Sequence, residues 1–344
     1  MRDIKYEQFW CVRVPKRSGE AVRSALAEMG ALQRNAAVRK DQEYLYFPLK
    51  DEINVDELKV SYSDLKLLRM DFEYEEKQTF ASILGFTPSF EMIGDLAIID
   101  SDDPDAAEIA DAILLIQKNI STVLGTLSPV TGEFRVREFC VLAGVPKTQT
   151  VHREYGCRYE VDLARVYFTP RLGTERKRIA DQIGQGDVVV DMFAGAGPFS
   201  ILIAKTVGQV QVVAIDKNPV AIEYLKRNAQ LNRTPNIKII CGDVRDIAPD
   251  LRNISDHLIM NLPHSANEFL NSALTILKPG GVIHYYDIAP DSDPFTGARE
   301  AIERAASDCG RELGGLVRVQ VLDERIVRSY SPHQYNVALD VRVG

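Results

Sequence analysis

The stretch Asp187-Val-Val-Val-Asp191-Met-Phe-Ala-Gly195-Ala-Gly197-Pro-Phe-Ser200 decides the fold of this chain. Its first half is a short apolar run, which is typical of a fully buried strand in a parallel sheet. Its second half contains two glycines, which let the backbone turn tightly and approach a ligand. The helix that follows can offer its first N–H groups to an anionic group. The stretch therefore predicts a strand, a ligand-binding turn and a helix.

Outward from this stretch, predicted strands and helices alternate to the end of the chain. A helix is predicted at 174–183, and further strands at 210–216, 237–242, 257–262, 282–288, 317–327 and 335–343. Alternation of this kind predicts a doubly wound, mostly parallel α/β sheet. The last two strands are joined closely around 331–334, so we expect them to pair antiparallel. A seven-stranded sheet with such an ending resembles the Rossmann-like fold of class I methyltransferases.

Acidic residues stand at the ends of three successive predicted strands: Asp191, Asp216 and Asp243. An acid after the second strand suits the two hydroxyls of a ribose. An acid after the third commonly accepts a hydrogen bond from adenine in enzymes that use S-adenosylmethionine. A nicotinamide dehydrogenase is the competing interpretation, but Ser200 stands at the third glycine position of GxGxxG. We therefore expect S-adenosylmethionine, bound by Asp191, Phe193, Ala194, Gly195, Gly197, Pro198, Asp216, Asp243 and Asn261.

The N-terminal half of the chain predicts two further segments. Residues 1–62 form a small α/β module, with strands at 9–14 and 44–49 and a helix that Gly30 ends. Residues 66–170 form an α+β domain, with a buried strand at 92–100, a helix from Pro104 to about Leu124 and polar strands that include 151–156. The Rossmann-like domain then occupies 171–344.

Composition and charge limit the class of protein. Hydrophobic residues make up 45% of the 344 residues, so each domain can bury a core. No apolar run approaches the ~18 residues of a membrane span, and the five cysteines form no CxxC pair, which favours a cytoplasmic protein without a metal site. The net charge is −8, yet residues 131–180 carry 10 basic and 6 acidic side chains, and residues 1–50 carry the same numbers. Because local charge steers an anionic ligand, nucleic acid stays a possible partner.

Two short elements suggest chemistry beside the ligand site. Asn261-Leu-Pro-His264 ends the fourth predicted strand, at the position where enzymes that methylate a planar nitrogen carry [DN]PP[YF]. Leu262 replaces the proline at the second position of that motif, and His264 replaces its aromatic residue, so an ordinary Asn-x-Pro turn is the simpler interpretation. Glu175 follows Thr174, which is placed to cap a helix, so Glu175 is either a favourable charge at a helix start or a catalytic base beside arginines.

The order of these motifs resembles one family. Tyr167-Phe-Thr-Pro-Arg171-Leu-Gly-Thr-Glu175-Arg176, the glycine-bearing turn, Asn261-Leu-Pro-His264 and Gly280-Gly-Val-Ile-His-Tyr-Tyr286 are similar to the archaeal and eukaryotic tRNA (guanosine-37 N1)-methyltransferases. Val14-Pro15-Lys16, Tyr44-Leu45-Tyr46 and Ser329-Tyr330-Ser331-Pro332 extend the resemblance to both ends of the chain.

The resemblance implies a function and roles for particular residues. It implies methylation of guanosine at position 37 of tRNA, without a metal, and no obligate protein partner is inferred. Glu175 matches the proposed general base, Arg135 the arginine at O6, and Asn261 the residue that holds the guanine edge. Tyr167 and Pro263 match pocket positions. Arg171 and Arg176 match arginines near the site, where either could contact substrate, bind a phosphate or have a structural role. Two alternatives stay open: a wyosine-pathway enzyme with the same cofactor, which transfers an aminocarboxypropyl or methyl group, and a non-catalytic tRNA-binding protein.

Overall fold

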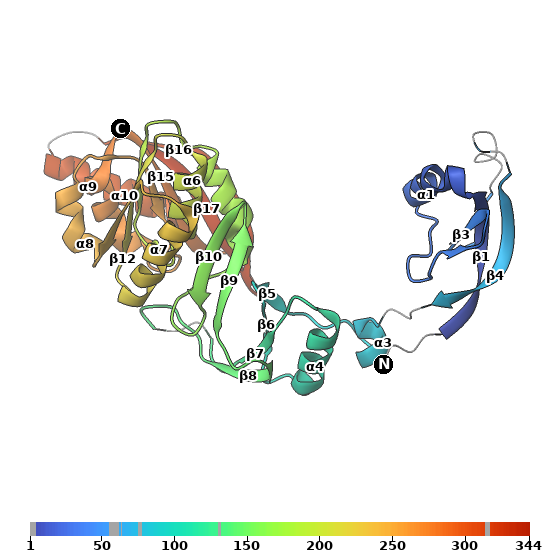
Figure 1. The fold of residues 1–344 in the computed structure, drawn as a ribbon. Helices are drawn as coiled ribbons and strands as arrows, with labels where there is room; N and C mark the ends of the chain where they lie inside the picture. Colours follow the sequence, from blue (N-terminus) through green and yellow to red (C-terminus); the bar gives the residue numbers. More distant parts are fainter. Residues whose placement is uncertain (1–4, 55–61, 63, 75–77, 130–131, 314–316) are drawn as a thin grey trace. The chain divides into compact units, whose positions relative to one another are not determined.

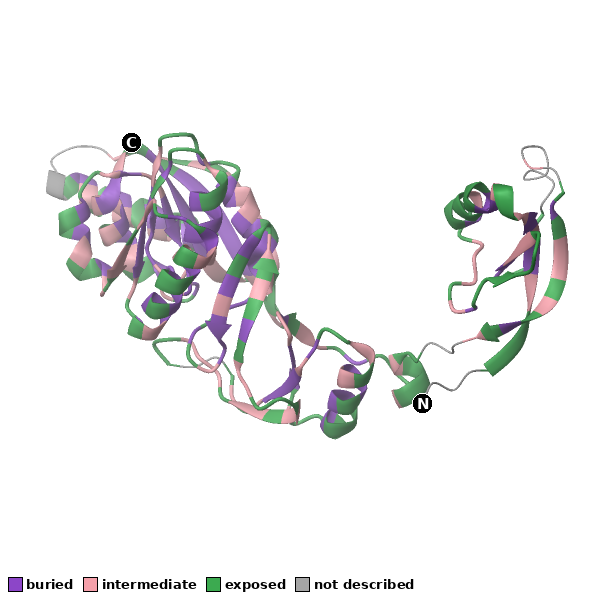
Figure 2. Ribbon diagram, in the orientation of Figure 1, coloured by how far each residue is buried: buried purple, intermediate pink, exposed green. Residues whose placement is uncertain are grey.

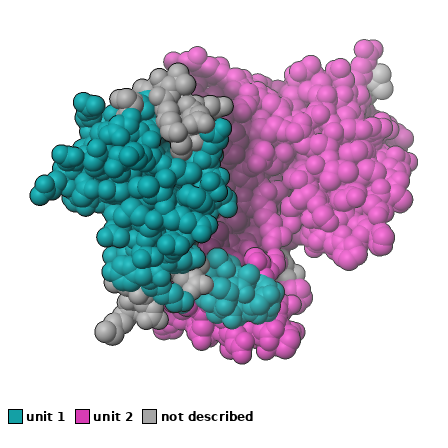
Figure 3. Space-filling model, turned by 90° about the vertical axis from the view of Figure 1, so that its right-hand side faces the viewer, with its two compact units in different colours: residues 1–86 teal, residues 87–344 magenta. Residues whose placement is uncertain are grey.

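The fold of the chain was analysed in a computed structural model, which describes residues 5–54, 62, 64–74, 78–129, 132–313 and 317–344 (Figure 1). It divides into two compact units, residues 1–86 and 87–344, which Figure 3 colours separately. Among the helices of the described ranges, none is long and apolar enough to cross a membrane.

The described part of the first unit contains a four-stranded antiparallel sheet with helix α1 (Gly19–Glu28) packed on it. Its order is β2 (Arg39–Lys40), β3 (Tyr44–Pro48), β1 (Lys5–Pro15) and β4 (Lys66–Tyr74). Helix α1 follows the short turn η1 (Lys16–Ser18), and its buried side chains Val22 and Leu26 pack on Val12 and Val14 of β1. The chain then leaves the helix through Gly30, which has a positive φ of 67°. The predicted order of strand, helix and strand is confirmed.

The end of the first unit lies further along the chain than the sequence predicted. Residues 66–74, which we expected in the middle domain, form β4 and pair with nine residues of β1, from Lys5↔Tyr74 to Arg13↔Lys66. The short helix α3 (Phe80–Leu84) also belongs to this unit. The segment 55–61 and residue 63, where we placed the end of the first module, lie outside the described residues. Strand pairing across such a segment leaves no local signal in the sequence.

The second unit begins with a small mixed sheet in the order β5 (Glu91–Ile93), β6 (Leu96–Asp100), β7 (Thr122–Thr126) and β8 (Phe139–Gly144). The predicted strand at 92–100 is two strands, because the chain turns at Gly94 with φ 60°. The helix predicted to reach Leu124 was wrong in its last part: α4 spans Ala106–Ile116, and β7 pairs in parallel with β6. Residues 120–124, Ile-Ser-Thr-Val-Leu, fit a buried strand as well as a helix, and pairing with the neighbouring strand decides between them.

A hairpin joins this sheet to the large one. Strands β9 (Gln149–Glu154) and β10 (Cys157–Asp162) pair antiparallel. Helix α7 (Pro219–Asn232) lies against β10, where the amides of Asn228 and Asn232 accept from the backbone N–H groups of Glu160 and Arg158 at 2.7 and 2.9 Å. The hairpin is thereby fixed to the C-terminal part of the unit.

The large sheet of the second unit contains, among the described residues, seven strands in the order β13-β12-β11-β14-β15-β17-β16. They are β11 (Val188–Asp191), β12 (Gln211–Asp216), β13 (Ile237–Cys241), β14 (Ser255–Met260), β15 (Leu277–Pro290), β16 (Val319–Ser331) and β17 (Gln334–Val343). The first five are parallel, and β17 runs antiparallel to both β15 and β16. The α/β class and the antiparallel final pair are as expected.

Helices on both faces bury this sheet (Figure 2). One core contains Val189, Val212 and Ile259, and the other contains their neighbours Val190, Val213 and Leu258, because successive side chains point to opposite faces. The helices and helical turns are η2 (Pro170–Leu172), α5 (Gly173–Ala180), α6 (Pro198–Thr206), α7, α8 (Val244–Ile247), η3 (Ala248–Leu251), η4 (Ala266–Phe269), α9 (Leu270–Ile276) and α10 (Thr296–Leu313). The strand order reverses between β11 and β14, and ligands of such sheets bind outside the carboxyl ends at that point.

Candidate active site

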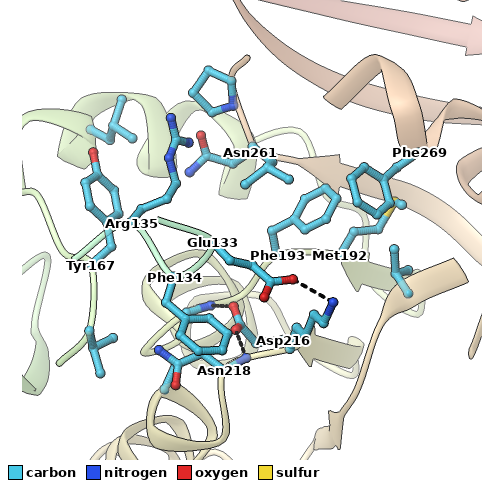
Figure 4. A pocket seen from close by; sticks show the side chains of 18 of the residues that line it. Glu133, Phe134, Arg135, Tyr167, Met192, Phe193, Asp216, Asn218, Asn261 and Phe269 are labelled. Atoms are coloured by element: carbon cyan, nitrogen blue, oxygen red, sulfur yellow. Dashed lines mark hydrogen bonds and ion pairs between the residues drawn. The ribbon is translucent and has the colours of Figure 1, made fainter. Parts of the chain in front are cut away.

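A cavity of about 500 Å³ lies at the carboxyl ends of the parallel strands. The loops after β11, β12, β13 and β14 supply Phe193, Asp216, Asp243 and Asn261 to its wall. The segment before β8 and the hairpin β16–β17 complete it with Arg135 and Tyr330. Figure 4 shows Arg135 extending toward Asn261, with Asp216, Asn218 and Phe134 on another side of the pocket. Its volume is in the usual range for a small-molecule site, which is about 300–1,000 Å³.

Acidic side chains characterise one end of the cavity. The Asp216 carboxylate accepts from the backbone N–H groups of Gly195 at 2.7 Å and Asn218 at 2.8 Å, which fixes it at the end of β12. Burial raises the pKa of Asp216, although these two N–H groups act in the opposite direction. Asp243 accepts from Arg245, and this ion pair holds the pKa of Asp243 well below its usual range. This end therefore presents carboxylates in fixed orientations, which suits hydroxyl and amine donors.

The glycine-bearing turn brings its backbone to the cavity. Gly195 lines it with a φ of 55°, and a Cβ added there would have only the Tyr167 carbonyl oxygen near it, at 3.9 Å. Gly197 has a different role, because a Cβ there would lie 2.1 Å from the Leu225 side chain. The turn therefore needs one glycine for its open face toward the ligand and one for packing against α7.

Asp191 lies behind this turn and not on the cavity wall. It is 1% exposed, and its Oδ2 accepts from the Ser200 hydroxyl at 2.7 Å. Burial raises its pKa to about 7, with a further contribution from the nearby Asp216 carboxylate. The structure therefore gives Asp191 a place in the support of α6, and Ala194, Gly197 and Pro198 likewise are absent from the described lining.

Arginines characterise the other end of the cavity. Arg135, Arg137, Arg171 and Arg328 all line it, together with Tyr167, Asn261 and Pro263. Arg171 donates to Glu91 at 3.1 Å, and Tyr167 is 38% exposed. Nearby, the hydroxyl of Tyr330 lies 3.0 Å from Nε2 of His264, so the hairpin β16–β17 is tied to the loop after β14. A cavity with carboxylates at one end and guanidinium groups at the other suits a neutral or cationic nucleoside beside an anionic partner.

Glu175 lies one helical turn beyond Leu172, which lines the cavity. It is 6% exposed, and its Oε1 accepts from the Tyr286 hydroxyl and Arg178 Nε, both at 2.9 Å. None of these bonds reaches Oε2. Thr174 does not cap the helix as predicted, because α5 already begins at Gly173, directly after the turn η2. The Thr169 side chain caps η2 by accepting from the Arg171 N–H group.

Arg176 is the largest fully buried side chain among the described residues and is absent from their cavity lining. Its guanidinium donates to both carboxylate oxygens of Glu154 and to the Thr169 carbonyl oxygen. Of the roles left open for Arg176, these contacts favour the structural one over contact with substrate. Arg176 ties α5 to β9 and fixes the segment that carries Tyr167 and Arg171.

Comparison with known proteins settles the family. Residues 150–314 match the TRM5/TYW2 methyltransferase domain, and residues 11–57 match the tRNA methyltransferase 5 N-terminal domain. The chain is 40% identical over 337 residues to the tRNA (guanine(37)-N(1))-methyltransferase Trm5b of Pyrococcus abyssi, with 97% of this chain and 98% of that one covered. The chain belongs to the TRM5/TYW2 methyltransferase family.

Solved structures of this family agree in fold. The complex structure of aTrm5 and tRNALeu matches with a TM-score of 0.74 and 36% identity, over 97% of this chain and 99% of that one. Methanocaldococcus jannaschii TYW2 in complex with AdoMet matches with a TM-score of 0.58 and 29% identity, over 74% of this chain and 99% of that one. The first of these relatives covers nearly the whole chain, and the second leaves about a quarter of it unmatched.

Several lining residues of this family member were absent from the sequence prediction. Phe269 meets the predicted Phe193 edge to face with ring centroids 5.0 Å apart. Lys217 and Glu133, which also line the cavity, pair with each other at 2.6 Å. The other missed residues include Phe134, Asn218, Arg137, Arg328, Tyr330 and Asn336. Asn218 stands two residues after Asp216, so the strand-end motif could have indicated it. The remainder come from segments whose approach to the cavity depends on tertiary structure.

Proposed function

We propose that this protein transfers the methyl group of S-adenosylmethionine to N1 of the guanosine at position 37 of tRNA. The observation that carries the proposal is the two-ended cavity: carboxylates lie at the end formed by β12 and β13, and arginines lie beside Asn261 at the end of β14. The family relationship supports it, because a relative with 40% identity has this activity in its name.

The residues at the acidic end fit S-adenosylmethionine. Asp216, held by two backbone N–H groups, has carboxylate oxygens placed to accept from ribose hydroxyls. The open backbone at Gly195 leaves room for the ligand, and Phe193 with Phe269 provides an aromatic wall. Asp243 would accept from the adenine amine, in competition with Arg245. The bound molecule supplies an electrophilic methyl group, and the chain supplies position and orientation.

The target base requires residues at the basic end. Enzymes that act on a base draw it out of its stack into a pocket. Arg135 donates to O6, where negative charge develops as N1 loses its proton, and Asn261 holds the base edge. Tyr167 and Pro263 form part of the pocket wall. Arg171 contributes positive charge on the exposed side of the pocket.

Glu175 is the proposed general base. The N1 atom of guanine carries a proton and is a weak nucleophile until the proton is removed. Tyr286 and Arg178 occupy Oε1 and orient the carboxylate, so Oε2 is the oxygen to receive the proton. Glu175 lies a turn behind the cavity wall, so this role needs its side chain or the base to approach when substrate binds, as catalytic hydrogen bonds often tighten only in the complex.

The domains have separate roles in this proposal. The first unit, residues 1–86, recognises the folded tRNA away from the target nucleotide, 87–170 contribute to tRNA binding and to the site, and 171–344 form the Rossmann-like catalytic domain. No protein partner is needed for this scheme, and the cytoplasm is the expected location.

One experiment tests the reaction and its target. The protein is incubated with labelled S-adenosylmethionine and an unmodified tRNA transcript with G at position 37, and the nucleosides are analysed by mass spectrometry. We expect 1-methylguanosine, and none when A replaces G37. Transfer to tRNA that already carries a wyosine intermediate, with none to G37, would favour the wyosine-pathway alternative instead. Binding of the methyl donor without transfer to either would favour the non-catalytic alternative.

A further inference from the structure

Three buried polar atoms without partners belong to residues that line the same cavity. Among the described residues, five buried side-chain N or O atoms have no hydrogen-bond partner, and three of them belong to Arg137, Arg328 and Asn336. All three residues line the cavity described above. Buried polar atoms in proteins are nearly always hydrogen-bonded, so three without partners on residues of one cavity point to a ligand that satisfies them.

These three side chains come from separate elements. Arg328 of β16 lies directly opposite Asn336 of β17 in the sheet register, where opposite Cβ atoms are about 4.5–5.5 Å apart. Asn336 is 2% exposed, and the atom without a partner is its Oδ1. Arg137 reaches the same wall from the segment before β8. In both arginines the atom without a partner is Nε.

A smaller cavity of about 110 Å³ adjoins this wall. Its lining includes Arg135, Arg137, Arg171 and Arg328, all of which also line the main cavity. Of these four, only Arg171 forms an ion pair within the part of the chain that the structure describes, with Glu91. Three guanidinium groups without counter-ions around a small space are suited to a bound oxyanion.

We propose that Arg137, Arg328 and Asn336 form a phosphate subsite, which binds a phosphodiester of the RNA next to the nucleotide to be methylated. The inference rests on the proposed function and adds the residues that hold the backbone of the target. The arginines donate to the phosphate oxygens. Asn336 Oδ1 accepts from the neighbouring ribose 2′-hydroxyl, the donor that adjoins a phosphate in RNA. The carboxylate of the methyl donor's amino-acid moiety is the other oxyanion within reach, and the experiment separates the two.

The test compares Arg328→Gln, Arg137→Gln and Asn336→Asp with wild type and with Arg325→Gln. Arg325 is a matched control, because it lies on the same strand but pairs with Asp323 and does not line either cavity. The Kd for tRNA is measured by fluorescence anisotropy at several salt concentrations, and the Kd for S-adenosylhomocysteine by calorimetry. Melting temperatures show which variants are folded.

We expect each arginine variant to weaken tRNA binding about tenfold, with the Kd for S-adenosylhomocysteine within about twofold of wild type. The slope of log K against log salt should fall by about 0.7 for each lost contact, the value for single-stranded nucleic acid. Asn336→Asp keeps the shape of the side chain but adds a negative charge, so it should weaken tRNA binding at least as much. Arg325→Gln should behave as wild type.

Two results would overturn the subsite. Weaker S-adenosylhomocysteine binding with unchanged tRNA binding would assign the oxyanion to the methyl donor. Unchanged binding of both ligands in folded variants would mean that the cluster holds neither. Because these are binding measurements, they stay separate from the reaction. Weakened tRNA binding in a protein that makes no 1-methylguanosine would reject the proposed function and keep the subsite.

Discussion

The proposed general base Glu175 has a carboxylate whose orientation is fixed. One oxygen accepts bonds from Tyr286 and Arg178, which fixes the orientation of the group. Arg178 also pairs with Asp340, so its charge is shared between two carboxylates and its pKa is raised. Glu175 lies one helical turn from Leu172, which lines the cavity. At the scale of single residues, the site therefore depends on side chains behind the wall as much as on those in it.

Replacing Glu175 by Gln should lower the rate of methyl transfer in a single turnover by about 10²–10⁴, the usual contribution of a positioned base. Arg178 keeps Asp340 as a partner, so the protein should still fold. The affinity for S-adenosylhomocysteine should be unchanged, because Glu175 is not among the described lining residues. Asp181→Asn, an exposed carboxylate change at the end of the same helix, is the control. A wild-type rate in Glu175→Gln would leave Glu175 with a structural role alone.

Asp191 predicts a pH dependence of stability. Burial raises its pKa to about 7, so the folded protein retains a proton there that the unfolded chain releases above its ordinary value of 3.8. Stability from this group therefore falls as pH rises from about 4 to 7. Asp191→Asn should raise the melting temperature relative to wild type at pH 8 and have less effect at pH 5. Asp256→Asn should lower the melting temperature at pH 8. Lys278 and the Val188 N–H group stabilise the Asp256 carboxylate and lower its pKa, and the substitution removes that stabilisation. Equal shifts at both pH values for Asp191→Asn would contradict the argument.

At the scale of elements, the sequence predicted those helices, strands and turns that depend on adjacent residues. The strand, turn and helix around Gly195 and Gly197 follow from a few adjacent residues, and Asp216, Asn261 and Arg135 do lie on one cavity. Residues and strands that become neighbours only in the tertiary structure could not be predicted from the sequence. Asn336 and Arg328 become neighbours through the register of β16 and β17, and β4 joins the first sheet by pairing with β1. Arg176 was predicted to lie near the site because it belongs to the motif that contains Glu175. Its burial depends on Glu154 of β9, a partner that the motif does not indicate.

The tie between α5 and β9 is testable through Glu154. Burial alone would raise the pKa of Glu154, but the hydrogen bonds from Arg176 and His152 lower it to about 2. Glu154→Gln leaves the Arg176 cation buried without a charged partner, which should cost about 3 kcal/mol. Thermal unfolding should show a melting temperature about 5–10 °C lower. Glu160→Gln breaks the exposed pair with Arg227 and should cost less than about 1 kcal/mol. A similar decrease in melting temperature in both variants would mean that the buried Glu154–Arg176 pair stabilises the protein no more than the exposed pair.

At the scale of the whole molecule, each unit has a core of its own. Val12, Val22, Leu26 and Phe47 are buried within the first unit, and the two faces of the large sheet are buried within the second. Each can therefore supply its own stabilising burial, which is what an independently folding domain requires. A fragment should therefore fold only if it begins at the boundary between the two units.

A fragment of residues 87–344 should fold and bind S-adenosylhomocysteine with the affinity of the full chain, because the described cavity lining lies entirely within it. Its KM for tRNA should rise, since the proposed recognition module is gone. A fragment of residues 66–344 tests the boundary itself. It retains β4 without β1, so Phe72, which is fully buried in the full chain, is exposed on an unpaired strand. Light scattering should show this longer fragment aggregating while the shorter one stays monodisperse. If instead the longer fragment is the better behaved of the two, residues 66–86 belong with the second unit.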